Sequence, residues 1–350
     1  MSHPSQDPPR AHSGAAPTLR MIAWELTRAC NLSCLHCRAA AVSSAPPGEL
    51  TTEECLALVD DIASFAQPTL ILTGGEPLLR PDLFPILSRA NARGLRTVAA
   101  VNGTLLDPPT AKRLADAGVR RISISLDGKD AASHDALRGV PGAFEGALRG
   151  IAAAREAALP FQINTTVTKQ NADQLPEILA LAIRLGAAAH HIFLLVPTGR
   201  AANLLGFELD ARHYEEVLQW LAGQVASAPI EIRATCAPHF YRILRQRGIP
   251  TQARGCLAGQ SFCFISHTGD VQPCGYFDVK CGNVRQMSLR EIWENAPLFR
   301  QLRDLSAYQG KCGFCEFRQV CGGCRARAYE ATGDPLAPEP LCAHVPGSCR

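Results

Sequence analysis

The sequence lacks the features that carry a protein into or across a membrane. Residues 1–20 contain proline, serine and histidine but no apolar stretch of the kind found in a secretory signal. The longest apolar run, around residues 192–196, is far shorter than the roughly 20 residues that span a bilayer. We therefore predict a flexible arm over 1–20, no membrane span and no export.

The chain also lacks a strong charge of either sign. Its 35 Lys and Arg residues nearly balance 32 Asp and Glu residues, which leaves a net charge of +3. This balance gives no support for nucleic-acid binding, which depends on attraction to phosphates. A chain of 350 residues with 47% hydrophobic residues and no internal repeat indicates a globular protein of two domains.

Cysteine, in contrast, is abundant. There are 15 cysteines, an odd number, and no secretory signal precedes them. This combination favours thiolate ligands in a reducing cytoplasm over disulfides. Ten of the cysteines follow residue 255, in a segment with many Gly and Pro residues and little periodicity. We expect that segment to contain little packed apolar surface and to be held together by metal coordination.

Short β-rich runs alternate with longer helical patterns from residue 21 onward. Predicted strands cover 22–26, 69–73, 97–101, 121–126, 162–168 and 191–196, and predicted helices cover 51–65, 82–93, 108–117, 143–157 and 172–185. Thr51 and Glu54 form a capping box at the first helix. Six strand–helix units predict an α/β fold with a parallel sheet, curled into a partial (β/α)6 TIM-type barrel with its chemistry at the C-terminal strand ends.

Composition divides the rest of the chain. After the arm and a core over 21–200, a connector over 201–255 carries two predicted helices, 210–226 and 238–247. The cysteine-rich domain then covers 256–350.

Cys30, Cys34 and Cys37 lie on one short loop after the first predicted strand. Three thiolates at this spacing can bind three irons of a [4Fe–4S] cluster, and full cysteine ligation needs four. The fourth iron would remain open to a cofactor or substrate. A structural zinc site would require a fourth Cys or His, and His36 lies inside the loop between two of the ligands.

This Cys-x3-Cys-x2-Cys motif resembles the signature of the radical S-adenosylmethionine (SAM) superfamily. The resemblance implies a [4Fe–4S] cluster on the three cysteines that cleaves SAM reductively. Gly74, Gly75, Glu76 and Pro77 resemble the turn that receives the SAM amino group, with glycines that permit close backbone approach. Polar residues near other strand ends are further candidate SAM contacts, namely Asn102, Ser123, Ser125 and Asn164, and the resemblance implies such contacts from the fourth and fifth strands. Arg138 is a further candidate cofactor contact, since it can pair with a carboxylate.

The C-terminal cysteines resemble the SPASM extension of radical SAM enzymes, which holds auxiliary [4Fe–4S] clusters. The resemblance implies one cluster on Cys312, Cys315, Cys321 and Cys342, and a second on Cys256, Cys263, Cys274 and Cys324. Cys321 and Cys324 are separated by two residues where the family usually has three, so the exact ligand partition stays open. One and two auxiliary clusters also stay open. No ligand role is assigned to Cys55, Cys236, Cys281 and Cys349.

Zinc is the alternative for this domain. Zinc ribbons also pair Cys-x2-Cys units, but at separations of about 15–20 residues. The two units here are separated by five residues, 316–320. The spacing favours iron–sulfur clusters.

Longer strings over 22–28, 162–168, 191–200, 234–242 and 321–329 resemble the heme b synthase family of the siroheme-dependent pathway. The resemblance implies oxidative decarboxylation of two propionates of iron-coproporphyrin III to vinyls, with a donor such as ferredoxin or flavodoxin. Related deacetylase and heme d1 enzymes, a SPASM peptide maturase, and a non-catalytic metal-binding module are the alternatives. A maturase is expected to carry an N-terminal leader-binding domain, which a 20-residue arm cannot be. Candidate propionate partners are Arg200, Arg242, His239 and His190.

Overall fold

The computed structural model describes residues 17–204, 206–251 and 254–347. Most of the arm predicted over 1–20 lies outside these residues. Its described end is packed, because Leu19 is buried, the Trp293 indole donates to the Pro17 carbonyl, and the Arg20 amide donates to the Ser261 carbonyl.

All six predicted strands are present in one sheet, and the sheet continues past them at both edges. A further parallel strand, β7, follows β6, and β8 pairs in parallel with β1. The order is β10-β9-β8-β1-β2-β3-β4-β5-β6-β7. The bounds are β1 Met21–Glu25, β2 Thr69–Thr73, β3 Arg96–Val101, β4 Ile122–Ser125, β5 Phe161–Val167, β6 Ala189–Leu194, β7 Glu231–Thr235, β8 Phe262–Ile265, β9 Asp270–Gln272 and β10 Gly282–Asn283.

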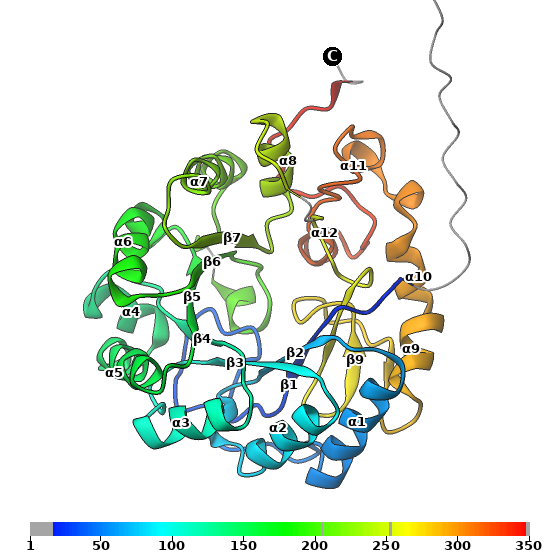
Figure 1. Ribbon diagram of the computed structural model, residues 1–350. Helices are drawn as coiled ribbons and strands as arrows, with labels where there is room; N and C mark the ends of the chain where they lie inside the picture. Colours follow the sequence, from blue (N-terminus) through cyan, green and yellow to red (C-terminus); the bar gives the residue numbers. More distant parts are fainter. Residues whose placement is uncertain (1–16, 205, 252–253, 348–350) are drawn as a thin grey trace, which may run out of the picture.

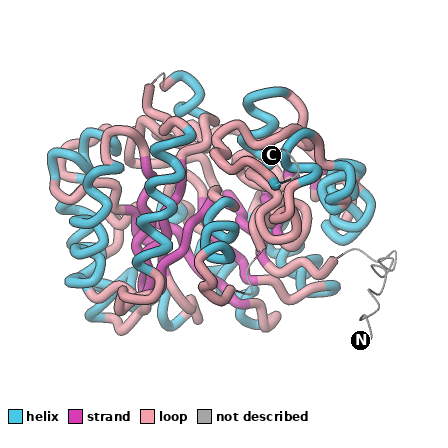
Figure 2. The backbone as a smooth tube through the Cα atoms, turned by 90° about the horizontal axis from the view of Figure 1, so that it is seen from above, coloured by secondary structure: helices cyan, strands magenta, loops and turns pink. Residues whose placement is uncertain are grey.

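The strands curve into an arc, with helices on its outer side (Figures 1 and 2). The predicted partial TIM-type barrel is confirmed, and the capping box of Thr51 and Glu54 is present. The sequence analysis missed the short helix α4, which begins at an Asp130 cap and ends at Gly139. The outer helices are α1 Thr52–Phe65, α2 Leu83–Ala92, α3 Pro108–Asp116, α4 Ala131–Arg138, α5 Ala143–Glu156, α6 Leu175–Leu185 and α7 Ala211–Gln224.

Residue alternation along the strands separates an outer apolar face from a more polar inner face. Ile122 and Ile124 of β4 belong to the main hydrophobic core under the outer helices. Ser123 and Ser125 therefore face the inside of the arc, since successive strand residues point to opposite sides. Gln162 and Asn164 of β5 stand beside them in register. The inside of the arc thus presents small polar groups, which suits a ligand better than a dry core.

The expectation of little packed apolar surface after residue 255 is wrong. Leu289, Ile292, Trp293 and Phe299 are all buried in the main core. The sequence concealed them because they lie on helices of seven residues, too short to show a clear period. The helices of the connector and C-terminal segment are α8 His239–Gln246, α9 Leu289–Asn295, α10 Pro297–Arg303, α11 Gly310–Phe314 and α12 Arg325–Thr332. Among the described residues, no helix combines the length and hydropathy that crossing a bilayer requires.

Candidate functional site

The loop that carries Cys30, Cys34 and Cys37 leaves the C-terminal end of β1. The Cys30 amide donates to the Val42 carbonyl at 2.8 Å, which closes the loop at its base. Each cysteine sulfur has a donor beside it: the Leu32 amide lies 3.4 Å from Cys30 Sγ, the Ala41 amide 3.4 Å from Cys37 Sγ, and Arg138 Nη1 3.6 Å from Cys34 Sγ. Hydrogen-bond donors around thiolate sulfurs are one means by which proteins set cluster potentials.

Arg200, in the turn that follows β6, holds this loop by hydrogen bonds. Its backbone amide donates to the Cys37 carbonyl, and its side chain donates to the carbonyls of Cys34 and Ala41 at 2.8 and 2.7 Å. Gly199 has a φ of +59°, and a Cβ there would lie 2.2 Å from the Arg38 carbonyl oxygen. The residue predicted as a propionate partner is therefore an anchor of the cysteine loop.

The Gly74–Gly75 turn packs directly against the same loop. The Gly75 amide donates to the Thr27 carbonyl at 2.7 Å. A Cβ on Gly74 would lie 2.4 Å from the Thr27 oxygen, and a Cβ on Gly75 would lie 2.2 Å from the Ala29 oxygen. Substitution at either position would force backbone apart. The sequence analysis attributed the glycines to close ligand approach, and the structure shows a close approach between two segments of this chain.

Glu76 is fully buried at the start of a 3₁₀ turn over Pro77–Leu79. Its carboxylate accepts from the amides of Leu78 and Asn102 at 3.0 and 2.7 Å. Burial raises the pKa of Glu76 to about 7, against the lowering effect of these two bonds. Each oxygen retains a lone pair for a further donor. A contact with the SAM ammonium stays a prediction.

Asn102 follows β3 and lies beside the first cysteine. Its Nδ2 atom donates to Asn31 Oδ1 at 2.8 Å and lies 4.0 Å from Cys30 Sγ. Its Oδ1 atom accepts from Thr104. Asn164 accepts from Gln162, at the position where Ser125 stands in register. The predicted polar residues of β4 and β5 therefore share one inner face, and their contacts with SAM stay predictions.

A buried network centred on Asp127 supports the loop. Asp127 Oδ2 lies 2.7 Å from Arg138 Nη2 and 3.2 Å from His36 Nε2. Burial opposes ionisation, but the Arg138 charge holds the pKa of Asp127 below its ordinary value. Burial lowers the pKa of His36 to about 4, so its ring is neutral at pH 7. The carboxylate that Arg138 pairs with is thus Asp127, which follows β4.

The four cysteines Cys312, Cys315, Cys321 and Cys342 line a single cavity. Cationic residues surround it, including Arg242, Lys311 and Arg318. His239 also lines it, with a buried ring whose two nitrogens have no hydrogen-bond partner. This lining fits a negatively charged iron–sulfur cluster. The four cysteines can supply its thiolate ligands, the cations its counter-charge, and the His239 ring a hydrogen-bond donor.

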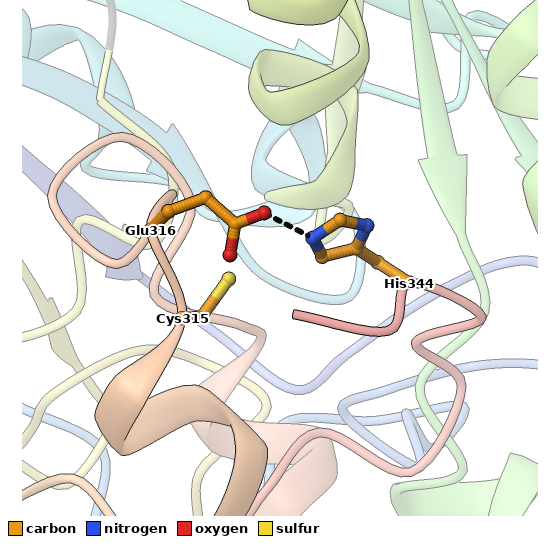
Figure 3. Close-up of side chains that lie close together, drawn as sticks. All are labelled: Cys315, Glu316 and His344. Carbon is orange, nitrogen blue, oxygen red and sulfur yellow. Dashed lines mark hydrogen bonds and ion pairs between the residues drawn. The ribbon is translucent and has the colours of Figure 1, made fainter. Parts of the chain in front are cut away.

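His344 lines this cavity, and Glu316 lies beside it. Figure 3 shows their side chains joined by a contact of 3.0 Å beside Cys315. The three ligand atoms lie within 4.8 Å of one another, close enough for one metal ion. Because Cys315 also lines the four-cysteine cavity, we assign the trio to that cavity and not to a separate site.

The second predicted cysteine set is brought together only in part. Cys256, Cys274 and Cys324 lie within electrostatic range of one another. Cys263 points elsewhere: it is fully buried on β8, in the main core. Cys236, to which no role was assigned, lies among the other three. The fourteen described cysteines, which exclude Cys349, are all free thiols.

The other candidate propionate partners also have contacts within the fold, and a propionate contact stays a prediction for each. Arg242 is buried and pairs with Glu215, while His239 packs edge-on against Tyr214. His190 is buried, and its Nε2 atom lies 2.8 Å from Thr165 Oγ1.

His190 should make the protein sensitive to mild acid. Burial lowers the pKa of His190 to about 3, so the folded protein keeps the ring neutral while the unfolded chain protonates it near pH 6.5. The stabilisation is present above pH 6.5 and is lost as the pH falls toward 3. Between pH 7.5 and 5 we expect a loss of about 2 kcal/mol.

Urea unfolding of anaerobic protein across this pH range measures that loss. His190→Gln should show a flatter pH dependence than the natural protein, because Gln binds no proton. The other buried histidines contribute equally to both proteins. Parallel pH profiles for the two proteins would contradict the assignment.

The fold and the cysteine groups define a class of enzyme. Residues 24–182 match the radical SAM superfamily, and residues 256–325 match the iron–sulfur cluster-binding domain SPASM. The chain belongs to the radical SAM superfamily and is a radical SAM enzyme, with a [4Fe–4S] cluster and SAM as cofactors and an auxiliary cluster domain.

Similarity to individual proteins extends over nearly the whole chain. An AdoMet-dependent heme synthase of Nitratidesulfovibrio vulgaris is 51% identical, covering 99% of this chain and 98% of that protein. A pre-heme d1 synthase of Dinoroseobacter shibae is 34% identical, covering 97% and 89%. The crystal structure of Streptococcus suis SuiB bound to its precursor peptide SuiA superposes with a TM-score of 0.78 at 18% identity, covering 94% and 77%. That last likeness concerns the fold alone.

Proposed function

We propose that this enzyme forms heme by oxidatively decarboxylating two propionates of iron-coproporphyrin III to vinyls. The observation that carries the proposal is the 51% identity to an AdoMet-dependent heme synthase over 99% of the chain. The inner face of β4 and β5 adds support, since it presents polar side chains in register, Ser123 beside Gln162 and Ser125 beside Asn164. We further propose a reducing cytoplasmic setting, since free cysteines are abundant. A low-potential donor such as ferredoxin or flavodoxin would supply the electron for SAM cleavage.

The chemistry balances with these parts. A propionate, R–CH2–CH2–COO⁻, gives R–CH=CH2 and CO2 when it loses one hydrogen atom from the carbon next to the ring and one electron. When bound, the cluster at the three-cysteine loop supplies the electron that splits SAM, SAM supplies the radical that takes the hydrogen atom, and an auxiliary cluster accepts the substrate electron. The second vinyl repeats the sequence with a second SAM.

The chain's own residues prepare this chemistry. We propose that Cys30, Cys34 and Cys37 hold the cluster, and that Glu76 receives the SAM ammonium. An ammonium beside Glu76 would favour the charged carboxylate and so lower its pKa from about 7. Arg200 and the Asp127–Arg138 pair keep the loop in place through the contacts described above. A rigid loop matters because the reacting atoms must be held at close range.

The proposal predicts a defined product. Anaerobic enzyme with SAM, dithionite and iron-coproporphyrin III should release two CO2 per porphyrin and form two 5′-deoxyadenosines, and mass spectrometry should find the divinyl product. A reaction without dithionite is the control. SAM cleavage that leaves the porphyrin unchanged would reject the substrate while keeping the radical SAM class. Turnover of a siroheme-derived substrate instead would favour an activity like that of the pre-heme d1 synthase relative.

A further inference from the structure

Cys236 stands directly after β7, at the same end of the sheet as the three-cysteine loop. Its φ is +56°, in the left-handed region that residues other than glycine rarely occupy. Two buried donors hold its carbonyl: Arg327 Nη2 and the Tyr214 hydroxyl, each at 3.2 Å. A strained residue persists only when its surroundings fix it. The fold therefore fixes where Cys236 presents its thiol.

That thiol faces other thiols. Cys236 and Cys274 pack in the same small cluster as buried Cys324, around Val196 and Phe277. Cys256 completes the group, within electrostatic range of Cys236 and Cys274. The Cys256 amide donates to the Cys321 carbonyl, so this group adjoins the four-cysteine cavity without sharing a cysteine with it.

Cys263 is turned away from the group by strand geometry. On β8 it stands in register with Ile22, and both side chains belong to the main core. The next residue, Phe264, points to the opposite face, where its ring lies 4.6 Å below the Arg38 guanidinium. Gly275, next to Cys274, lies against this same ring, and its carbonyl accepts from Arg38. Cys263 and Cys274 thus lie on different sides of the strand.

A buried ion pair beside the group connects two of its cysteines. Arg327 is fully buried and donates both to the Cys236 carbonyl and to Glu339. Glu339 in turn accepts from the Cys324 amide at 2.7 Å. One ion pair therefore binds the backbones of two cysteines on different elements. Glu339 is the counter-charge that buried Arg327 requires, so the pair fixes these two backbones beside the thiols.

We propose that Cys236, and not Cys263, is the fourth ligand of a second auxiliary [4Fe–4S] cluster, with Cys256, Cys274 and Cys324. The cluster type follows from the SPASM match, and the ligand set follows from the placement of the four thiols. The assignment stands whatever the enzyme's substrate is. It replaces the sequence-derived set in one position.

The test compares Cys236→Ala with Cys263→Ala, which remove one thiol each at positions 27 residues apart. Cys236 is half-buried and Cys263 is fully buried. Each protein is reconstituted anaerobically, and iron, zinc and sulfide per chain are measured. The natural protein should hold about 12 irons, from three clusters of four. Cys263→Ala should keep about 12, and Cys236→Ala should fall to about 8 if the whole cluster is lost, or to about 11 if a three-iron cluster remains.

Spectroscopy separates cluster loss from misfolding. In Cys236→Ala, dithionite-reduced EPR should lose or shift one auxiliary signal, while SAM cleavage at the three-cysteine loop continues. Loss of iron in Cys263→Ala with full iron in Cys236→Ala would overturn the proposal. A natural protein with only about 8 irons, or with zinc in place of four of them, would overturn it as well. So would a Cys236→Ala protein with unchanged iron and EPR.

Discussion

Cys34→Ser is expected to abolish reductive SAM cleavage, with a rate lower by more than about a thousandfold, equivalent to about 4 kcal/mol of barrier. Cys34 is buried, its carbonyl accepts from Arg200, and its sulfur lies beside Arg138. A serine hydroxyl at this place keeps the packing but is not the thiolate ligand that a cubane requires. With only three thiols in the loop, no neighbour can replace it. The measurement is 5′-deoxyadenosine formed per enzyme under dithionite.

Cys281→Ser provides the control. Cys281 lies beside the buried Cys263 and in neither of the two C-terminal cysteine groups described above. Its replacement should leave deoxyadenosine formation within about twofold, as for other changes away from a site. Unimpaired cleavage by Cys34→Ser, measured beside this control, would remove the basis for the three-cysteine cluster.

Arg327→Met is expected to destabilise the folded protein by about 3–5 kcal/mol, the usual cost of leaving one member of a buried ion pair alone. Glu339 is completely buried and would lose its cation. The carbonyls of Leu195 and Cys236, which now accept from Arg327, would lose their donor. Methionine fills similar volume, so lost charge and hydrogen bonds dominate the change. The midpoint of urea unfolding under anaerobic conditions measures it.

Two comparisons sharpen this expectation. Lys112→Met breaks an exposed pair with Asp116 and should cost no more than about 0.5 kcal/mol. The double variant Arg327→Met with Glu339→Gln removes both charges and should recover part of the loss, since no unpaired charge remains. Equal effects of Arg327→Met and Lys112→Met would show that the buried pair has no special role.

The strands could be predicted because each is a short apolar run bounded by turn residues. The cysteine loop could be predicted because its three ligands lie within eight residues, where spacing alone fixes which thiols can meet. Cys236 and Cys263 could not be sorted this way. Cys236 follows β7 and Cys263 lies on β8, 27 positions later, and these strands are at opposite ends of the parallel part of the sheet. The direction in which each side chain points decides which of the two lies near Cys256. For Cys263 this direction depends on the register between β8 and β1, which the sequence does not display.

The supporting residues were hidden for a related reason. Arg200 and Arg138 each bond to the cysteine loop across more than 100 positions. An arginine in a sequence of mixed charge looks the same whether it is solvated or buried. Polar residues near strand ends indicated the C-terminal end of the strands as the site. Their hydrogen-bond partners within this chain could be identified only from the structure.

The edge strand β7 has one further consequence. In the sheet order β7 and β10 stand at opposite ends, so within the part of the chain that the structure describes no ladder of backbone hydrogen bonds joins β7 to β8. Cys236 leaves β7, whereas Cys256 precedes β8. The proposed cluster, bound by both cysteines, would cross-link these two edges, which strand pairing joins in a closed barrel. Loss of this cluster would then loosen the contact between the β7 and β8 edges, while the three-cysteine loop keeps its own contacts after β1.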